Sequence, residues 1–288
     1  MLSILIVNWN TRALLADCLR SIYEHPPSGP WEVVVVDNAS TDGSADMVRS
    51  EFPGVILVAS SVNTGYAKGN NLAFAVAKGD FLLTLNPDTA FLDDSLDRAV
   101  ARLENRPALG CLGVMQIGVD GQIQSSVRGF PTVTGIFGDL SGLGAKMGGK
   151  WDSYRLSRFD YSVEQPAPQP MGTFLLFRAT ALASIGDVHK PFDEGFPIFF
   201  NEVDLLYRLK LSGWDCLYTP NASIKHYGGE GTKQRRKSMI WESHRSLVHY
   251  FRKHHGTGFG RVGLPFLAAG VYAAAFIRAR GFHAGFRP

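Results

Sequence analysis

Cysteine is scarce in this sequence, and its scarcity excludes two kinds of covalent stabilisation. The 288 residues contain three cysteines, Cys18, Cys111 and Cys216, which lie far apart and form no CxxC spacing. An odd number of scattered thiols predicts neither a disulfide framework nor a structural zinc site. We therefore expect a protein of the cytosol, where thiols stay reduced.

Net charge and long apolar runs are also modest. A formal charge of +3 is too small to suggest nucleic-acid binding, so we expect no nucleic-acid partner. The N-terminal apolar run at 2–7 is shorter than a signal-peptide core and continues into Asn8 and Asn10, so it predicts a first strand. Hydrophobic residues nevertheless make up 45% of the chain, enough for a sizeable core.

The first hundred residues alternate between short β-rich runs and helical patterns. Such alternation is typical of a parallel sheet covered by crossover helices, and it predicts a doubly wound α/β core. Strands are expected at 3–7, 32–36, 55–59 and 81–85, and helices after Thr11 and from about 66 to 77.

Beyond residue 105 the pattern weakens. The stretch 132–150 is rich in glycine and lacks a clear period, so we expect a mobile loop there that could serve as a lid over an acceptor. Order returns with a predicted strand at 172–177 and a predicted helix from about 202 to 211, which ends at Gly213.

Acidic residues follow two of the predicted strands. Asp37 closes one strand, and Asp88 follows another in the turn Asn86-Pro-Asp88. Ligands of open parallel sheets bind beyond the carboxyl ends of the strands, where a carboxylate could hold a hard divalent cation together with pyrophosphate oxygens. The alternative is that Asp88 only caps the helix predicted near Asp93.

Two other nucleotide-binding motifs can be excluded. The segment 144–150 matches the start of a phosphate-binding P-loop, but Trp151 replaces the required Ser or Thr and no strand precedes it. The first strand is followed by 8–11, which is not a glycine-rich dinucleotide fingerprint. A nicotinamide enzyme is therefore not expected. Neither is a nucleotidyltransferase, which would need a loop rich in glycine and lysine at that place.

Several short motifs occur in one order and together carry a family resemblance. They are Ile4-Leu-Ile-Val-Asn-Trp-Asn10, Val36-Asp-Asn-Ala-Ser-Thr-Asp-Gly43, Asn63-Thr-Gly-Tyr-Ala-Lys-Gly-Asn-Asn71, Asn86-Pro-Asp88, Phe192-Asp-Glu194, Phe200-Asn-Glu-Val-Asp-Leu205, Arg208, Gly213-Trp214 and His226. The chain resembles the family-2 inverting glycosyltransferases of the GT-A fold over roughly residues 2–256, especially their rhamnosyltransferase-like branch.

The resemblance implies a fold and a domain organisation. The expected fold is GT-A, a Rossmann-like, mostly parallel sheet flanked by helices, with an amphipathic helical extension at the C-terminus. We expect a glycosyltransferase domain at 1–230, with a nucleotide-binding half at 1–105 and an acceptor-side half at 106–230. Residues 231–288 would form the basic and apolar extension.

The same resemblance assigns donor and metal residues. Asp88 and His226 would hold a divalent metal, Mn²⁺ or Mg²⁺. The alternative for His226 is a structural histidine bonded to the backbone. The donor-binding residues that the resemblance implies are Asn8, Asp37, Asn63, Gly65, Lys68, Asn70, Asn86 and Asp88.

The catalytic base is where this sequence departs from the family pattern. Relatives usually carry Glu-Asp, one further residue and a second Asp, and the matching positions here are Asn201, Glu202 and Asp204. Glu202 thus replaces the usual aspartate base, whose role is to accept the acceptor hydroxyl proton. The alternative is that these acids only complement the helix dipole. Asp204, Arg208 and Trp214 are expected on the acceptor side or in a secondary role.

The C-terminal part differs in kind from the rest. Residues 262–277 are apolar but, with Pro265 inside, fall short of the roughly 20 residues that span a bilayer. An apolar segment bounded by arginines predicts a helix at an anionic lipid interface. The alternatives are packing on the core and a contact in a homodimer. The flanking arginines are Arg261, Arg278, Arg280 and Arg287, and a further basic cluster at 233–237 could meet lipid headgroups, an acceptor diphosphate or only solvent.

These features together predict a function. We expect an inverting glycosyltransferase that moves a sugar, with rhamnose favoured by the resemblance, from a nucleotide diphosphate donor to a glycan or a polyprenyl-diphosphate-linked acceptor. It would serve cell-envelope polysaccharide synthesis at the inner face of the cell membrane. The alternative is a nucleotide-sugar binding module or scaffold that is catalytically weak because Glu202 replaces the aspartate.

Overall fold

A computed structural model describes residues 1–228, 236–256 and 260–280. In the predicted basic cluster, 233–235 lie outside the described residues, and so does Arg287. The strands are β1 (Leu2–Asn8), β2 (Trp31–Asn38), β3 (Ile56–Ser60), β4 (Phe81–Leu85), β5 (Thr89–Ala90), β6 (Leu109–Ile117), β7 (Val127–Arg128), β8 (Gln165–Pro166), β9 (Gln169–Pro170), β10 (Phe174–Arg178) and β11 (Asp215–His226). The helices are α1 (Arg12–Glu24), α2 (Ser44–Glu51), α3 (Tyr66–Phe74), α4 (Ser95–Glu104), α5 (Val133–Ser141), α6 (Leu143–Met147), the 3-10 helix η1 (Gly149–Trp151), α7 (Ala179–Ala183), α8 (Asn201–Leu211), α10 (Arg236–His255) and α11 (Gly260–Ala279).

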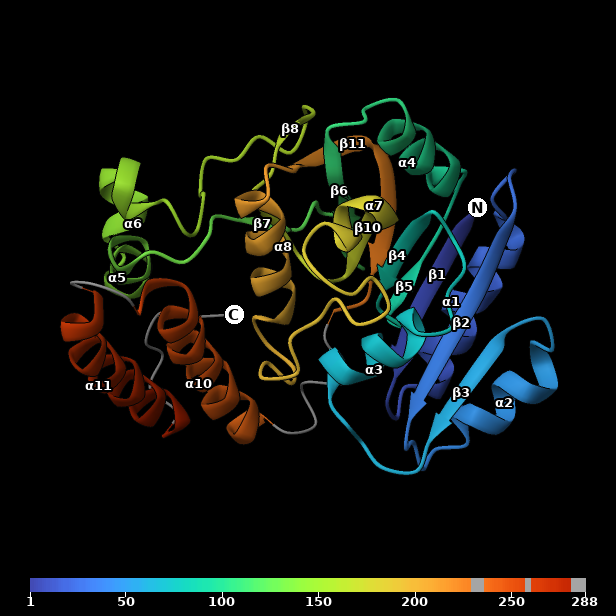
Figure 1. Cartoon of the computed structure of the whole chain (residues 1–288), viewed down its shortest axis with the longest axis horizontal. Helices are drawn as coiled ribbons and strands as arrows, with labels where there is room; N and C mark the ends of the chain where they lie inside the picture. The colour runs from blue at the N-terminus through green and yellow to red at the C-terminus, as the bar shows by residue number, and fades with distance from the viewer. Residues whose placement is uncertain (229–235, 257–259, 281–288) are drawn as a thin grey trace.

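One sheet organises the described part of the chain. Its strand order is β3-β2-β1-β4-β10-β6-β11-β5, with β8 paired to β11 (Figure 1). The strands β1 to β4 run parallel to one another, as predicted. The inner strands β1, β2 and β4 are mostly apolar because helices cover both faces of the sheet, and Ile4, Leu5 and Val34 are fully buried, whereas the edge strand β3 is partly exposed.

Strand β10 runs against its neighbours and so makes the sheet mixed. It pairs antiparallel with both β4 and β6, with Phe174 opposite Leu85. The beginning of β10 therefore lies at the sheet edge where the parallel strands end. The two residues before it, Gly172 and Thr173, join that edge.

The prediction of a mobile loop at 132–150 is wrong. This segment forms α5, α6 and η1, and the Thr132 hydroxyl accepts a hydrogen bond from the Gly135 amide at the start of α5. The glycines allow close packing instead of a flexible loop. A Cβ on Gly138 would lie 2.0 Å from the Trp151 carbonyl oxygen, so only glycine lets the two backbones meet there.

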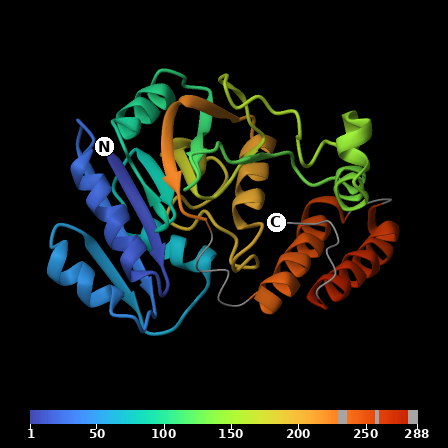
Figure 2. The same ribbon diagram turned by 180° about the vertical axis from the view of Figure 1, so that it is seen from behind.

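The C-terminal helices pack beside α8, at the end of the molecule far from β3 (Figures 1 and 2). A shared apolar cluster joins Val203 of α8, Tyr250 and Phe251 of α10, and Val271 of α11. One face of the predicted lipid-facing helix therefore packs on the protein. Among the helices of the described residues, none is both long enough and apolar enough to cross a bilayer.

Candidate active site

The predicted donor residues gather where β1, β2 and β4 end. Asn8 and Asp37 are register partners at the ends of adjacent parallel strands. The Asn8 amide donates to Asp37 Oδ1 at 3.1 Å, and the Ser40 backbone amide donates to Asp37 Oδ2 at 3.0 Å. These bonds hold the turn after β2 against the end of β1. Asp37 is 3% exposed, so its buried carboxylate fixes the turn by accepting hydrogen bonds from Asn8 and Ser40.

A second turn, at 63–66, borders the same edge. The Asn38 amide donates to Asn63 Oδ1 at 3.1 Å and to the Gly65 carbonyl at 3.0 Å. Gly65 has φ +84°, and a Cβ there would lie 2.8 Å from the Pro197 carbonyl oxygen, so the turn requires glycine. Lys68 is exposed on the first turn of α3. The structure thus brings the end of β1 and two polar turns together around one edge of the sheet.

Asn70, on α3, is buried beneath this turn. Its amide donates to the Tyr66 carbonyl at 2.9 Å, while its side-chain oxygen is buried and no described residue donates to it. The next residue, Asn71, was not predicted as a site residue. It accepts from the Phe192 amide at 3.0 Å and donates to the Phe192 carbonyl at 3.0 Å, fixing the 192–197 segment on α3.

Tyr66 connects the donor side to the predicted base. Its hydroxyl lies 3.1 Å from Asn86 Oδ1 and 3.3 Å from the Gly172 carbonyl oxygen, and it can donate to both. Burial, reinforced by the nearby negative charges of Glu202 and Asp88, raises the pKa of this phenol. The phenol therefore stays protonated and acts as a hydrogen-bond donor. No pattern in the sequence pointed to this role.

Asp88 and His226 lie side by side at the end of β11. His226 Nε2 is 3.5 Å from Asp88 Oδ2, and both residues are buried. Gln124 donates its amide to the His226 carbonyl at 3.2 Å, which turns its oxygen toward His226 Nδ1 at 2.7 Å. Because the Gln124 oxygen accepts, Nδ1 donates to it, and Nε2 is the ring nitrogen that faces Asp88.

This pair fits a hard or borderline divalent cation. A carboxylate and an imidazole nitrogen suit Mn²⁺, and a side chain that fixes the imidazole tautomer is usual behind metal-ligating histidines. In the described part of the chain, no group of three or more His, Cys, Asp or Glu side chains could hold a metal. The two residues would therefore need oxygen ligands from a bound diphosphate to complete the coordination.

Glu202 lies in the first turn of α8, next to the beginning of β10. A Cβ on Gly172 would be 3.5 Å from Glu202 Cγ, so the absence of a side chain at 172 leaves room for the carboxyl arm. Glu202 is half-buried, and burial raises its pKa from 4.5 to about 7. Phe200, just before α8, has φ +65°, a strained conformation for a bulky residue that sets the entry to this helix.

Asp204 binds the C-terminal helix α10, and Arg208 pairs with Asp204 and donates to the Pro191 carbonyl. Asp204 is fully buried and accepts from Arg208 Nε at 2.8 Å, from His254 Nε2 at 2.8 Å and from Lys253 Nζ at 2.6 Å. Despite its burial, the bonds to His254, Arg208 and Lys253 lower its pKa to about 2. Asp204 therefore ties two helices together.

Trp214 lies at the opposite edge of the sheet. It precedes β11, whose far end carries His226, and its indole donates to Ser184 Oγ at 2.8 Å. The ring packs over Gly110, where a Cβ would be 2.8 Å from Trp214 Cβ. The structure thus gives Trp214 a packing role and does not bring it to the predicted site.

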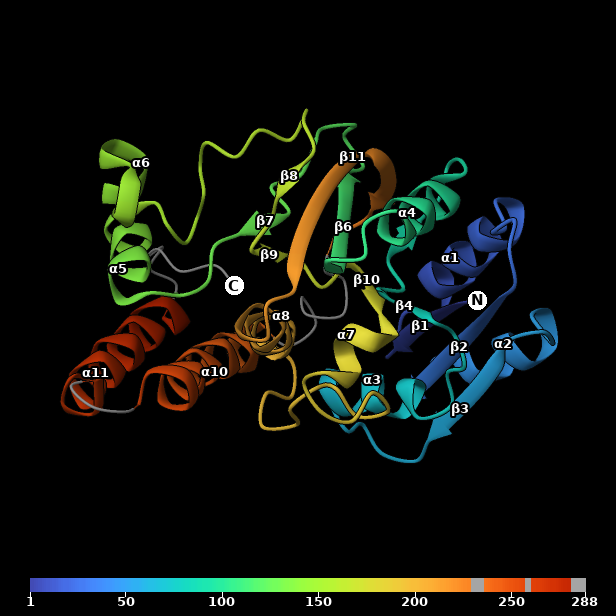
Figure 3. The same cartoon turned by 45° about the horizontal axis from the view of Figure 1, so that its top comes forward.

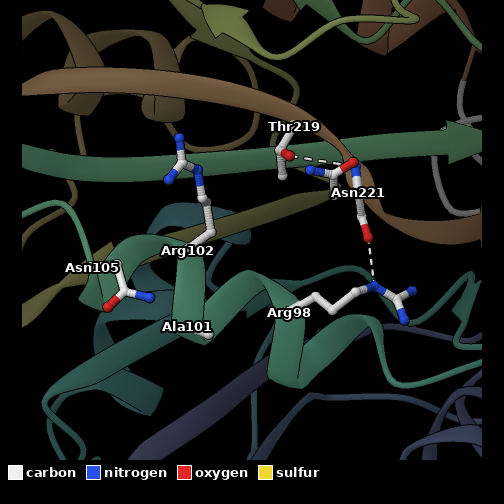
Figure 4. A pocket seen from close by; sticks show the side chains of 6 residues that line it. All are labelled: Arg98, Ala101, Arg102, Asn105, Thr219 and Asn221. Atoms are coloured by element: carbon white, nitrogen blue, oxygen red, sulfur yellow. Dashed lines mark hydrogen bonds between the residues drawn. The ribbon is translucent and has the colours of Figure 1, made fainter.

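A surface pocket beside α4 is separate from this edge. Figure 4 shows its lining, which is Arg98, Ala101 and Arg102 of α4, Asn105 just after α4, and Thr219 and Asn221 of β11. The two arginines are already engaged, because Arg98 pairs with Asp93 and Asp94 and Arg102 pairs with Glu164. These ion pairs account for the basic character of the pocket without a ligand.

Comparison with known proteins relates this geometry to a family. Residues 3–185 match the family described as Glycosyl transferase family 2. The chain is also 27% identical, over 261 residues, to an N-acetylglucosaminyl-diphospho-decaprenol L-rhamnosyltransferase of Mycobacterium tuberculosis (strain ATCC 25618 / H37Rv). That match covers 85% of this chain and 81% of the relative.

Solved structures show the same fold. The mannosyltransferase PcManGT from Pyrobaculum calidifontis, in complex with GDP-Man and Mn²⁺, has a TM-score of 0.59 at 19% identity, covering 98% of this chain and 76% of that one. S. aureus TarS 1-349 in complex with UDP has a TM-score of 0.56 at 17% identity, covering 96% and 82%. These likenesses confirm the predicted GT-A fold.

Proposed function

Because the chain belongs to glycosyl transferase family 2, we propose that it transfers a sugar from a nucleoside diphosphate to a polyprenyl-diphosphate-linked glycan, inverting the anomeric carbon. The observation that carries this proposal is the meeting of Glu202, Tyr66 and Asn86 around Gly172 at the edge where the parallel strands end. Glu202 and the polar edge both border Gly172, which supports a general base that acts on an acceptor facing the donor. An inverting displacement needs this arrangement.

The donor would occupy the edge formed by the turns after β1, β2 and β3. Asn8, Asp37 and Asn63 border the place of the nucleoside, and exposed Lys68 adds a positive charge near the diphosphate. Asp88 and His226 would hold Mn²⁺ or Mg²⁺, which when bound would offset negative charge on the leaving diphosphate. Mannosyltransferase PcManGT was solved with GDP-Man and Mn²⁺, which supports the metal proposal without assigning residues.

Glu202 would act on the acceptor. Its carboxylate takes the proton of the acceptor hydroxyl while that oxygen bonds to the anomeric carbon and the bond from that carbon to the diphosphate oxygen breaks. The pKa of about 7 suits this task, because a sizeable fraction of Glu202 is ionised at neutral pH and is basic enough to accept the proton. This property favours an enzyme over the alternative of a nucleotide-sugar scaffold.

The acceptor class and the sugar come from the relative. The mycobacterial relative is named as a rhamnosyltransferase that acts on N-acetylglucosaminyl-diphospho-decaprenol. We therefore propose a rhamnosyl donor, a lipid-linked acceptor and a place on the inner face of the cell membrane, in cell-envelope glycan synthesis.

A thermal-shift screen tests the donor proposal. Nucleotide diphosphate sugars are added to the full chain with and without Mn²⁺, because a ligand that binds only the native state raises the unfolding temperature. We expect one nucleotide class to stabilise the protein, and to do so more strongly with Mn²⁺. If no nucleotide diphosphate or nucleotide sugar shifts the transition under either condition, the proposal is wrong.

A further inference from the structure

Helix α11 is apolar on both of its faces. One face packs on the protein, with Val271 and Ala275 buried against α10. The opposite face is left bare: Phe266 is 78% exposed, Phe276 47% and Ile277 45%. An ordinary surface helix has one apolar face, which packs on the protein, and one polar face, which meets solvent. The exposed apolar face of α11 therefore indicates a contact with a second apolar surface outside the described chain.

The charged residues that flank this helix in the sequence have one sign. Between 262 and 277 the sequence contains no charged residue, and from 243 to 288 it contains no Asp or Glu. Arg280 lies over the Phe276 ring, with its guanidinium carbon 4.0 Å from the ring centroid. An apolar strip bounded only by cations matches the apolar interior and the anionic headgroups of a bilayer surface.

The helices α5 and α6 add a second bare strip at the same end of the molecule. Figures 1 and 3 show α5 next to α11 and α6 beyond α5, and Ile136 of α5 shares an apolar cluster with Val271 of α11. Three of their side chains are exposed and apolar: Val133 at 57%, Phe137 at 54% and Met147 at 61%. Lys146 and Lys150, on either side of Met147 in the sequence, are also exposed.

We propose that the bare face of α11, together with the exposed apolar side chains of α5 and α6, forms a lipid-binding surface that seats the protein on anionic membranes. α11 would lie in the plane of the interface, because α10 already covers its other face. A second copy of the chain is a poorer occupant, because two such faces would bring their arginines together without any acid in 243–288 to pair with them. This proposal adds to the proposed function the surface on which the enzyme would meet a lipid-linked acceptor. Only this connection with the acceptor rests on the proposed function.

Vesicle sedimentation tests the surface. The full chain is mixed with vesicles of phosphatidylcholine alone and with vesicles containing about one third phosphatidylglycerol. We expect binding to the anionic vesicles and much less to the neutral ones. Phe266→Glu and Phe276→Glu should each lower the anionic-vesicle partition coefficient about tenfold, because they place a like charge among the headgroups and remove an inserted ring.

Val163→Glu is the matched control. Val163 is 47% exposed, the same fraction as Phe276, and lies just before β8, outside this surface. It should leave vesicle binding unchanged. The proposal is overturned if the wild-type protein ignores anionic vesicles, or if Phe266→Glu binds them as well as the control does.

A second measurement separates the other outcomes. Analytical ultracentrifugation of the same variants reports the oligomeric state. If Phe266→Glu dissociates a dimer and leaves vesicle binding intact, the bare face belongs to a second copy and the lipid proposal fails. Mn²⁺-assisted nucleotide binding should be equal in wild type and Phe266→Glu, so a loss of lipid binding can be told apart from a failure of the proposed glycosyl transfer.

Discussion

Replacing Glu202 with glutamine keeps the size and polarity of the side chain and removes its ability to accept a proton. Under saturating donor, transfer should fall by about 10² to 10⁴ fold, the usual contribution of a general base. Donor and metal binding should remain, because Glu202 lies across Gly172 from the donor edge. The assay is the rate of labelled sugar transfer, with donor affinity measured in parallel.

The pH dependence follows from the burial of the carboxyl group. With its pKa raised from 4.5 to about 7, Glu202 holds a proton through mildly acidic pH. The wild-type transfer rate should therefore rise about tenfold per pH unit below neutrality and level off above it, and Glu202→Gln should lose this dependence. A wild-type rate that stays flat between pH 5 and 8 would contradict the assignment of Glu202.

Glu202→Gln should raise the stability of the folded protein although it lowers the transfer rate. A carboxyl whose pKa is higher in the folded than in the unfolded state destabilises the fold as pH rises from 4.5 through 7. At pH 8, after an allowance for partial exposure, Glu202→Gln should therefore stabilise the protein by about 2 kcal/mol. Urea titrations of both proteins at pH 4 and pH 8 measure this gain, which should vanish at the lower pH.

Two further variants locate the base. Glu202→Asp restores a carboxylate on a shorter arm, so its rate reports whether the site has adapted to glutamate or keeps the usual family geometry. Asp204→Asn is the control on the same helix. Near-normal turnover in Glu202→Gln, with Asp204→Asn folded but inactive, would assign the base to Asp204 and refute our reasoning.

Three other predictions concern the metal pair and the helix junction. Asp88→Ala should abolish Mn²⁺-assisted nucleotide binding by calorimetry and nearly all transfer, and unchanged Mn²⁺-assisted binding would remove Asp88 from the metal site. Gln124→Leu should weaken Mn²⁺ affinity about tenfold, because it frees the His226 ring, and an unchanged affinity would count against His226 as a ligand. Asp204, with its pKa lowered to about 2, contributes stability that is present above its unfolded pKa of 3.8 and is lost as pH falls toward 2. Asp204→Asn should therefore destabilise the protein by about 2 kcal/mol at pH 7 by removing the buried carboxylate that Arg208, Lys253 and His254 share, with a smaller penalty at pH 2 to 3, and an equal loss at both would refute this role.

The parallel core and its edge could be predicted because a strand buried on both faces is a run of apolar residues in the sequence. The run 33–36 is uniformly apolar since both of its faces are covered, and the polar residue that ends it is expected at the ligand-binding edge. Asp37 and Asn8 were expected at one edge for this reason, and the structure makes them register partners. No comparison assigns their roles, so the donor-binding role stays a prediction.

The contacts that complete the site could not be predicted, because they join residues remote in sequence. Tyr66 reaches Gly172, and Gln124 reaches His226, each across about a hundred positions. Asp204 was expected on the acceptor side or in a secondary role, from the family pattern that it shares with Glu202. The structure directs it instead to His254, and only packing of α10 on α8 reveals that partner. The glycines of 132–150 led to the wrong prediction of a loop for a related reason. Tertiary contacts, which the sequence does not show, decide between a loop and a closely packed helix.

The most direct test of the central claim is transfer itself. The full chain is incubated with Mn²⁺, a panel of nucleotide diphosphate sugars that includes deoxythymidine diphosphate rhamnose, and N-acetylglucosaminyl-diphospho-polyprenol, and the lipid product is analysed by mass spectrometry and NMR. We expect one donor to yield a glycosylated lipid whose new linkage has the configuration opposite to that of the donor, with the product lost in both Asp88→Ala and Glu202→Gln. A product of retained configuration, or undiminished product from both variants, would contradict the account.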